Sequence, residues 1–122
     1  MSDKKKLVVI VTNGLDNERS SVAWSVANGG VASGMEVHIF LVSSGVDWVR
    51  KGAADVARLN PPDPPIMEMI QRVTDNGGRI MVCPPCAQIR GYDKEHLLDG
   101  IELAGSVSML AHVAEGAATL TF

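Results

Sequence analysis

The stretch Lys6-Leu-Val-Val-Ile-Val-Thr12, which Asn13-Gly14 follows, decides the fold of this 122-residue chain. Its central residues are all apolar and mostly β-branched, which is typical of a β-strand buried on both faces. Strands of this kind belong to parallel sheets that helices cover on both sides. The stretch therefore predicts the first strand of an α/β protein.

The rest of the chain alternates between apolar runs of strand length and segments with helical periodicity. We expect further strands at residues 36–42, 79–83, 101–104 and 118–122, and helices at 18–33, 47–57, 65–75, 94–98 and 106–115. This alternation predicts a three-layer α/β/α sandwich around a mainly parallel sheet of about five strands. No repeat or linker divides the sequence, so residues 1–122 are expected to form one domain.

Two of the expected helices have a defined start and an apolar face. Asp16 or Asn17 can cap the first helix, and Gly34 can end it. Pro65, the last residue of a proline-rich connector at 60–65, is suited to be the first residue of the helix that ends at residue 75. The face that we expect to be buried consists of Val22, Val26, Ala27 and Gly30 in the first helix, and of Ile66, Met69, Ile70 and Val73 in the second.

The composition narrows the range of functions. Hydrophobic residues make up 46% of the chain and aromatic residues 4%, and 11 Lys and Arg against 14 Asp and Glu give a net charge of −3. We expect no nucleic-acid partner, because phosphate binding needs a basic face and stacking aromatics. The apolar stretch behind the lysines at 4–6 is too short for a signal peptide, and no later stretch could cross a bilayer. We therefore expect a cytoplasmic protein without membrane contact, whose cysteines are reduced.

Both cysteines lie in one short motif, Val82-Cys-Pro-Pro-Cys-Ala-Gln-Ile-Arg-Gly-Tyr92. The motif follows the expected third strand, and active sites of open α/β sheets collect at the carboxyl ends of strands. The two prolines suit the first turn of a helix, which would place Cys83 at the helix N-terminus. That position, and an Arg90 that shares a helical face with Cys83 and Cys86, are expected to lower the pKa of a thiol.

Three other interpretations of the two cysteines are open. Free cysteine is often a small buried apolar residue, so Cys83 and Cys86 could be structural. A thioredoxin-like dithiol shares their spacing, but in that fold the motif follows an early strand and an aromatic residue. A closed zinc site would need further ligands, for which His38 within an expected strand is a poor candidate and His96 a nearer one. We expect neither a metal nor a cofactor.

The chain resembles the DsrE/DsrF-like family of sulfur-relay proteins in its C-x-x-C-x-x-x-R-G motif and in the order of the elements around it. The likeness extends over nearly the whole chain, from the opening strand with Gly14 to the closing Thr119-Leu120-Thr121-Phe122. Members of this family with established activity pass sulfur as a cysteine persulfide between partner proteins. They assemble as dimers, trimers or hexamers.

The resemblance implies roles for the motif residues. In the sulfur-transfer branch the reactive cysteine stands seven residues before the arginine, which matches Cys83, whereas other members keep a cysteine four residues before it, which matches Cys86. We expect Cys83 to accept sulfur, Cys86 to be a second or resolving thiol, and Arg90 to stabilise the anion. Such a protein is a sulfurtransferase-like carrier with donor and acceptor proteins as partners. A dithiol redox protein and a non-catalytic oligomeric α/β binding module are the alternatives.

The last expected helix, at 106–115, is apolar on most sides. Such a helix is buried on most sides, so we expect another subunit to cover part of it and the chain to form a homo-oligomer. His112 is expected to be a packed or interface residue. One apolar face consists of Val107, Leu110, Ala111 and Ala114, and Met109 and Val113 add another.

Residues elsewhere have ordinary expected roles. Trp24 and Trp48 are expected to pack in the core, and Asp47 and Arg50 to be solvated. Asn13, Gly14 and Asp16 are expected to form a turn and a helix cap after the first strand.

Overall fold

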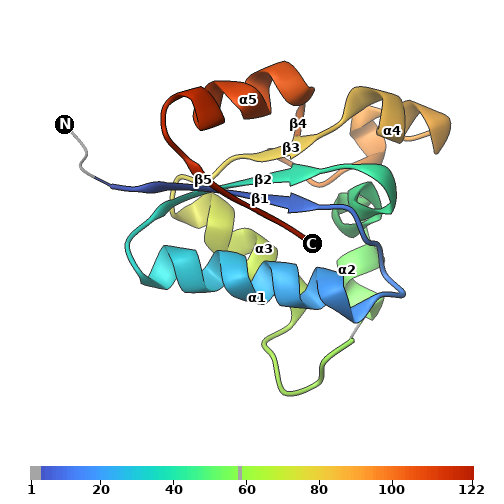
Figure 1. Ribbon diagram of the computed structural model, residues 1–122. Helices are drawn as coiled ribbons and strands as arrows, with labels where there is room; N and C mark the ends of the chain where they lie inside the picture. The colour runs from blue at the N-terminus through green and yellow to red at the C-terminus, as the bar shows by residue number, and fades with distance from the viewer. Residues whose placement is uncertain (1–3, 58) are drawn as a thin grey trace.

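The computed structural model describes residues 4–57 and 59–122 (Figure 1). One sheet of five strands has the order β4-β3-β2-β1-β5, and every neighbouring pair is parallel, which confirms the predicted α/β fold. The strands are β1 (Lys6–Val11), β2 (Glu36–Leu41), β3 (Ile80–Val82), β4 (Glu102–Leu103) and β5 (Ala118–Thr121). The α-helices are α1 (Glu18–Ala32), α2 (Ala53–Val56), α3 (Ile66–Asp75), α4 (Pro84–Ile89) and α5 (Ser106–Ala114), with 3-10 helices η1 (Ser43–Val49) and η2 (Lys94–His96). Within the two described ranges, no helix is long and apolar enough to cross a membrane.

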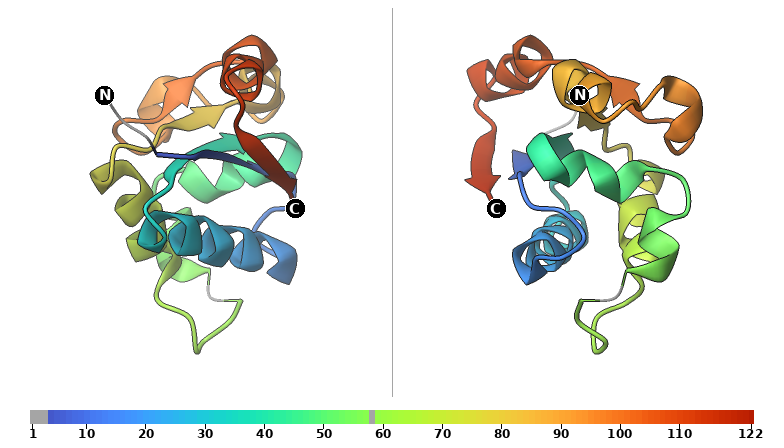
Figure 2. Two further views of the ribbon diagram at one scale, coloured as in Figure 1. Left: turned by 60° about the vertical axis from the view of Figure 1, so that its left-hand side comes forward. Right: turned by 90° about the vertical axis from the view of Figure 1, so that its right-hand side faces the viewer.

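Helices cover the two faces of the sheet unequally (Figure 1, Figure 2). α1 and α3 pack against each other on one face, whereas α5 lies over the other face. On the α1 side, alternate strand residues form the main hydrophobic core with Trp24 and Trp48, whose predicted packing role is confirmed, since both are 0% exposed. Side chains alternate between faces along a strand, so Val8, His38 and Met81 are buried on the α5 side.

The cap of α1 is one of the two predicted residues, but the buried face of this helix differs in part from the prediction. Asn17 is the N-cap, and its side chain accepts a hydrogen bond from a backbone N–H of the first turn at 2.9 Å. Gly30 lies so close to the sheet that a Cβ atom there would be 2.9 Å from a Val37 methyl carbon. Val22 is 46% exposed, so its predicted burial is wrong. Trp24 is buried in the core instead, so α1 is rotated about its own axis relative to the predicted orientation.

Two other predicted helices have different bounds in the structure. The helix expected from Pro65 begins one residue later, at Ile66, with Pro65 as its N-cap. The single helix expected at 47–57 is two short ones, η1 and α2, because the chain turns between them at Gly52, whose φ is +88°. The predicted apolar face of α3 is confirmed, since all four of its residues are buried: Ile66, Met69, Ile70 and Val73.

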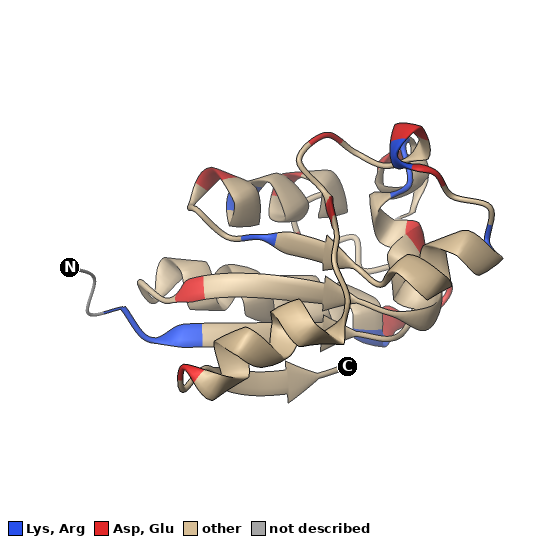
Figure 3. Cartoon of the chain, turned by 90° about the horizontal axis from the view of Figure 1, so that it is seen from above, with Lys and Arg blue, Asp and Glu red and all other residues tan. Residues whose placement is uncertain are grey.

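α5 is the element whose environment differs most from the prediction. Of its residues only His112 is buried, whereas Val107 is 83% and Leu110 is 53% exposed. Figure 3, which looks down on α5, shows no charged residue along the helix, and Glu115 follows as its C-cap. β5, at the edge of the sheet, is exposed along its whole length. The described part of the chain therefore leaves both predicted apolar faces of α5 largely uncovered.

Candidate thiol site

The two cysteines lie where β3, between β2 and the edge strand β4, ends and α4 begins. Cys83 is the N-cap of α4, and its N–H donates to the Leu41 carbonyl at 3.0 Å, which continues the sheet. Pro84 and Pro85 form the first turn, as predicted, and Cys86 follows them. Both thiols are free and half-buried. The sequence motif is therefore a thiol pair at the carboxyl edge of a parallel sheet, the edge at which active sites of such sheets collect.

The loop after the neighbouring strand β2 supplies a hydrogen-bond donor to one of the two sulfur atoms. The Ser43 N–H donates to Cys86 Sγ at 3.2 Å. Among the described residues, Ser43 is the only non-glycine residue with a positive φ, at 52°. This uncommon backbone conformation places the N–H at the thiol pair. The sequence predicted a turn after the second strand, but nothing in Ser43-Ser44-Gly45 indicates which residue has positive φ.

Close packing of the first two strand ends holds this loop in place. Gly45 N–H donates to the Val42 carbonyl at 2.9 Å. A Cβ atom on Gly45 would lie 2.2 Å from the Val11 carbonyl oxygen, so only glycine fits. Gly14, in the turn after β1, is similarly close to Ser44. The predicted turn residues thus support the thiol site through the loop after β2.

The electrostatic environment of Cys83 is opposite to the one predicted. Burial, the largest effect, raises the pKa of Cys83 above its ordinary value of 9.0. A hydrogen bond from the Cys86 backbone lowers the pKa of Cys83, but the neighbouring Cys86 thiol raises it again. The expectation that the helix N-terminus would lower the pKa of Cys83 is therefore wrong, because desolvation outweighs the one hydrogen bond from the helix.

Arg90 lies at the end of α4 and contacts the backbone of the motif. Its Nη1 donates to the Cys86 carbonyl at 3.1 Å, and its Nε is 3.9 Å from Asp47 Oδ1. Among the described contacts, none joins the guanidinium directly to a sulfur atom. The structure thus brings Arg90 to the same loop as both cysteines, with the peptide of Cys86 between its charge and the thiols.

Asp47 and Tyr92 complete the site, although the sequence assigned neither of them to it. The Tyr92 hydroxyl donates to Asp47 Oδ1 at 2.5 Å. Burial first, and then the Asp47 carboxylate, raise the pKa of Tyr92 above 10.0. The prediction that Asp47 is solvated holds only in part, since 29% of its side chain is exposed and the rest is engaged in this site. The only available signal was that Tyr92 ends the cysteine motif, and no local pattern links it to a residue in η1.

The histidines considered as zinc ligands lie elsewhere. His96 Nδ1 accepts the Asp93 N–H at 2.9 Å within a capping box. His38 is bonded to Glu36 and to the backbone of Arg79. Across residues 4–57 and 59–122, neither cysteine belongs to a group of three or more metal-ligating side chains. The geometry gives no support to a closed zinc site at the thiols.

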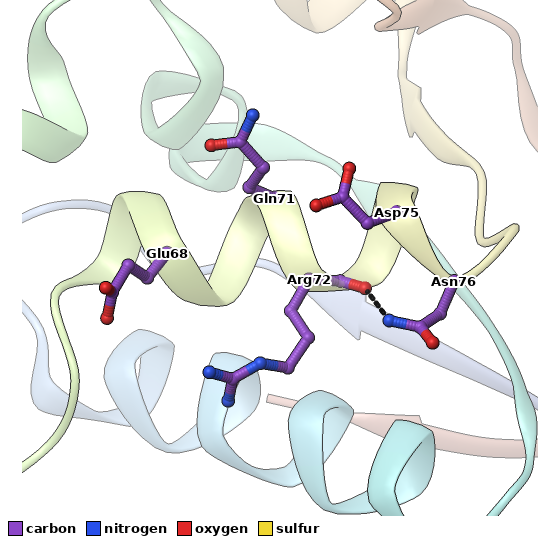
Figure 4. Close-up of a pocket in the computed structure, with 5 residues that line it drawn as sticks. All are labelled: Glu68, Gln71, Arg72, Asp75 and Asn76. Carbon is purple, nitrogen blue, oxygen red and sulfur yellow. Dashed lines mark hydrogen bonds between the residues drawn. The ribbon is translucent and has the colours of Figure 1, made fainter.

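A hollow of about 250 Å³ lies on α3, away from the thiol motif (Figure 4). Two of its lining side chains already have partners, since Asn76 Nδ2 donates to the Arg72 carbonyl at 2.8 Å and Arg72 Nη1 donates to Asn28 Oδ1 at 3.2 Å. The hollow has no cysteine or histidine, so the thiol pair is the better candidate site. The lining residues all belong to α3 or its C-cap: Glu68, Gln71, Arg72, Asp75 and Asn76.

Comparisons with known proteins agree with the resemblance. A family model described as the DsrE/DsrF-like family matches residues 5–122. The uncharacterized protein MJ0989 of Methanocaldococcus jannaschii is 32% identical over 119 residues, which are 96% of this chain and 99% of the relative.

Solved structures show the same fold. The ychN protein from E. coli superposes with a TM-score of 0.77 at 21% identity, over 98% of this chain and 99% of that chain. MTH1491 from Methanobacterium thermoautotrophicum, a protein of unknown function, has a TM-score of 0.70 at 18% identity, over 98% of this chain and 100% of that chain.

Proposed function

Because the chain belongs to the DsrE/DsrF-like family, we propose that it is a cytoplasmic sulfur carrier that holds sulfane sulfur as a persulfide on Cys83. It would exchange this sulfur with donor and acceptor proteins of a relay. The observation that supports the proposal most is the pair of free, half-buried thiols at the carboxyl end of β3. Both thiols are partly exposed, so a partner's sulfur atom can reach them.

The proposed reaction conserves electrons. The Cys83 sulfur attacks the outer sulfur of a donor persulfide, so that an S–S bond forms at Cys83 while the S–S bond of the donor breaks. The donor leaves as a thiolate, which takes up the proton that Cys83 has lost. One thiol and one persulfide are consumed and one of each is formed. Cys83 attacks as its thiolate, and because burial raises the pKa of Cys83, this thiolate is the minor form of the free protein at neutral pH.

The other motif residues support the acceptor in this proposal. Cys86 is the second thiol, and the Ser43 N–H fixes the position of its sulfur at 3.2 Å. Arg90 supplies positive charge at the end of α4, and its bond to the Cys86 carbonyl holds the guanidinium there. An acceptor thiolate attacks the outer sulfur on Cys83, takes it away as a new persulfide, and restores the Cys83 thiol.

The proposal is tested by intact-mass measurement after exposure to a low-molecular-weight persulfide donor. Wild type and Cys86→Ser are expected to gain the mass of one sulfur atom, and Cys83→Ser is expected not to gain it. Cys86→Ser is the matched control, since it removes a thiol from the same loop. Equal adducts on wild type and Cys83→Ser, or no adduct on wild type, would contradict the proposal.

A dithiol redox protein is the second candidate, because one specific contact favours it. The Cys83 and Cys86 thiols are close enough to interact, and the Cys86 thiol raises the pKa of Cys83. Closing a disulfide between them would transfer two electrons and two protons to an external disulfide. Rapid formation of this disulfide in a glutathione buffer, together with no sulfur adduct, would favour this candidate. Slow alkylation of both thiols at every pH would instead favour a non-catalytic α/β binding module.

We also propose that the chain forms a homo-oligomer through α5 and β5. The apolar residues that these elements expose are the supporting observation, and a second copy with the same surface could cover them. Sedimentation velocity at micromolar concentration is expected to show an assembly larger than one chain, and a stable monomer would overturn the proposal. The exposed residues are Val107, Leu110, Val113 and Leu120.

A further inference from the structure

Two stacked histidines lie between α5 and the sheet, in a region that the proposed sulfur chemistry does not use. His38 of β2 is 3% exposed and His112 of α5 is 7% exposed. Their ring centroids are 4.1 Å apart, and the ring planes differ by 19°. His112 is the one buried residue of α5, so the attachment of this helix depends on an imidazole. Its two ring nitrogens are buried and have no hydrogen-bond partner among the described residues.

The hydrogen bonds of His38 fix its tautomer. The Arg79 backbone N–H donates to Nδ1 at 3.1 Å, so Nδ1 carries no proton. Nε2, 2.8 Å from Glu36 Oε2, is then the protonated nitrogen and donates to that carboxylate. The ligand atoms of Glu36, His38 and His112 all lie within 4.8 Å of one another, but this tautomer leaves His38 no free lone pair for a metal. The cluster is therefore a hydrogen-bonded histidine stack.

The charged groups around His112 do not favour a positive charge on its ring. Lys6 of β1 lies 2.7 Å from the Glu115 carboxylate at the C-cap of α5. Arg79, before β3, binds Glu102 of β4 at 2.8 Å. Glu36 of β2 already accepts from His38. The carboxylates on every element around the stack are thus engaged with other cations or with His38.

We propose that α5 is a pH-sensitive flap, which protonation of His112 releases from the sheet and therefore also from the second copy proposed to cover it. The site between α5 and the sheet accommodates His112 as a neutral imidazole. An imidazolium there would find no hydrogen-bond acceptor, since neither ring nitrogen has a partner among the described residues. Once α5 is detached, His112 is in water and can bind the proton without cost. Because β5 is bonded to β1 along its length, the movement is confined to α5 and the loops at its ends.

The direction of the pH effect follows from the environment of His112. Burial first, then His38, Lys6 and Arg79, lower the pKa of His112 below its ordinary 6.5 in the attached state. Attachment is therefore fully favoured above pH 6.5 and weakens as the pH falls below that value. If only the detached state binds the proton, the ratio of detached to attached helix rises about 30-fold between pH 7.5 and 5.0. The pKa values of Glu36 and Glu115 lie below 4.5, so these carboxylates stay ionised over this range.

Hydrogen exchange of α5 amides, expressed as protection factors at pH 7.5 and 5.0, tests the proposal. Wild type is expected to lose protection in α5 by up to about 30-fold at pH 5.0. Trp24 and Trp48 lie in the opposite layer, so their fluorescence is expected to stay constant and to report that the fold persists. His112→Phe retains an aromatic ring without a titrating group, and it is expected to show no such loss.

Two results would overturn the proposal: constant protection in wild type, or the same loss in His112→Phe. His112→Leu replaces the phenylalanine variant if the latter does not fold. A third measurement needs no variant. The His112 ring proton in the NMR spectrum of wild type is expected to titrate with a midpoint below 6.5, and a midpoint at or above that value would contradict the proposed mechanism.

Discussion

The two faces of the sheet are built in different ways. On the α1 side, Trp24 and Trp48 lie fully buried in a continuous apolar core. On the α5 side, the helix contributes a single buried residue, the polar His112, and leaves Val107 and Leu110 in solvent. Because burial of apolar surface is the main source of folding free energy, the α1 side stabilises the domain. The α5 side is the one on which a partner or a change of pH can act without unfolding the protein.

Removing a large side chain on the α1 side is expected to have the largest effect. Trp24→Ala leaves a cavity in the core and should lower the free energy of unfolding by about 3–5 kcal/mol. Urea denaturation of Trp24→Ala and of Val107→Ala compares the loss of unfolding free energy on the two faces of the sheet. A loss below about 1 kcal/mol for Trp24→Ala would contradict the assignment of stability to the α1 side.

Gly45→Ala is expected to have the next largest effect on stability, because it adds a methyl group where the ends of β1 and β2 pack closely beside the thiol site. A Cβ atom there would be 2.2 Å from the Val11 carbonyl oxygen, so the loop after β2 must move. We expect a loss of about 2 kcal/mol and a changed alkylation rate of Cys86. Gly29→Ala is the control, since its Cβ would meet nothing within 4 Å and the change should stabilise α1 by about 0.5–1 kcal/mol. Unchanged stability and Cys86 reactivity in Gly45→Ala would show that the close packing is unimportant.

Tyr92→Phe is expected to cost less, because it removes one hydrogen bond and leaves the ring. The loss of the bond to Asp47 should lower the free energy of unfolding by about 1 kcal/mol at pH 7. Since the pKa of Tyr92 is raised above 10.0 in the folded state, this contribution is present below pH 10 and is lost as the pH rises further. Chemical denaturation at pH 7 and above pH 10 should therefore show the variant and wild type converging. No difference at pH 7 would mean that the hydroxyl has no role, and a difference that persists unchanged above the pKa of Tyr92 would contradict the bond to Asp47 as its source.

The smallest effect on stability is expected on the α5 side. Val107→Ser should change the free energy of unfolding by less than about 0.5 kcal/mol, because the side chain is 83% exposed. The same change should weaken self-association in sedimentation velocity. Val56→Ser on α2, also 83% exposed, is the matched control and should leave association unchanged. Equal behaviour of the two variants would remove α5 from the proposed interface.

The α1 side was predictable from sequence to a larger extent than the α5 side. The apolar run of β1, the Asn17 cap and the apolar face of α3 are local patterns, and each was found where it was expected. Val22 was misplaced, because the large indole of Trp24 determines which face of α1 meets the sheet. The exposure of α5 could not be predicted either, since an apolar helix has the same sequence pattern whether its own chain or another one covers it.

The candidate site was predictable only in part. The spacing of Cys83 and Cys86 after a strand indicated the thiol pair at a sheet edge, because the motif is local. The hydrogen bond from Ser43 to Cys86 depends on the backbone φ of +52° at Ser43, and a serine at that position does not predict a positive φ. The contact between Asp47 and Tyr92 joins two loops that only the tertiary fold brings together. The predicted low pKa of Cys83 neglected the burial of the sulfur atom.

Locating the added sulfur within wild type tests the central claim most directly. The protein is treated with a persulfide donor, alkylated and digested, and the peptide that contains both cysteines is fragmented in the mass spectrometer. Fragmentation between Cys83 and Cys86 assigns the extra sulfur atom to one of them. The account predicts the alkylated persulfide on Cys83, with Cys86 carrying only the alkyl group. Extra sulfur confined to Cys86, or a peptide with an internal disulfide and no extra sulfur, would contradict it.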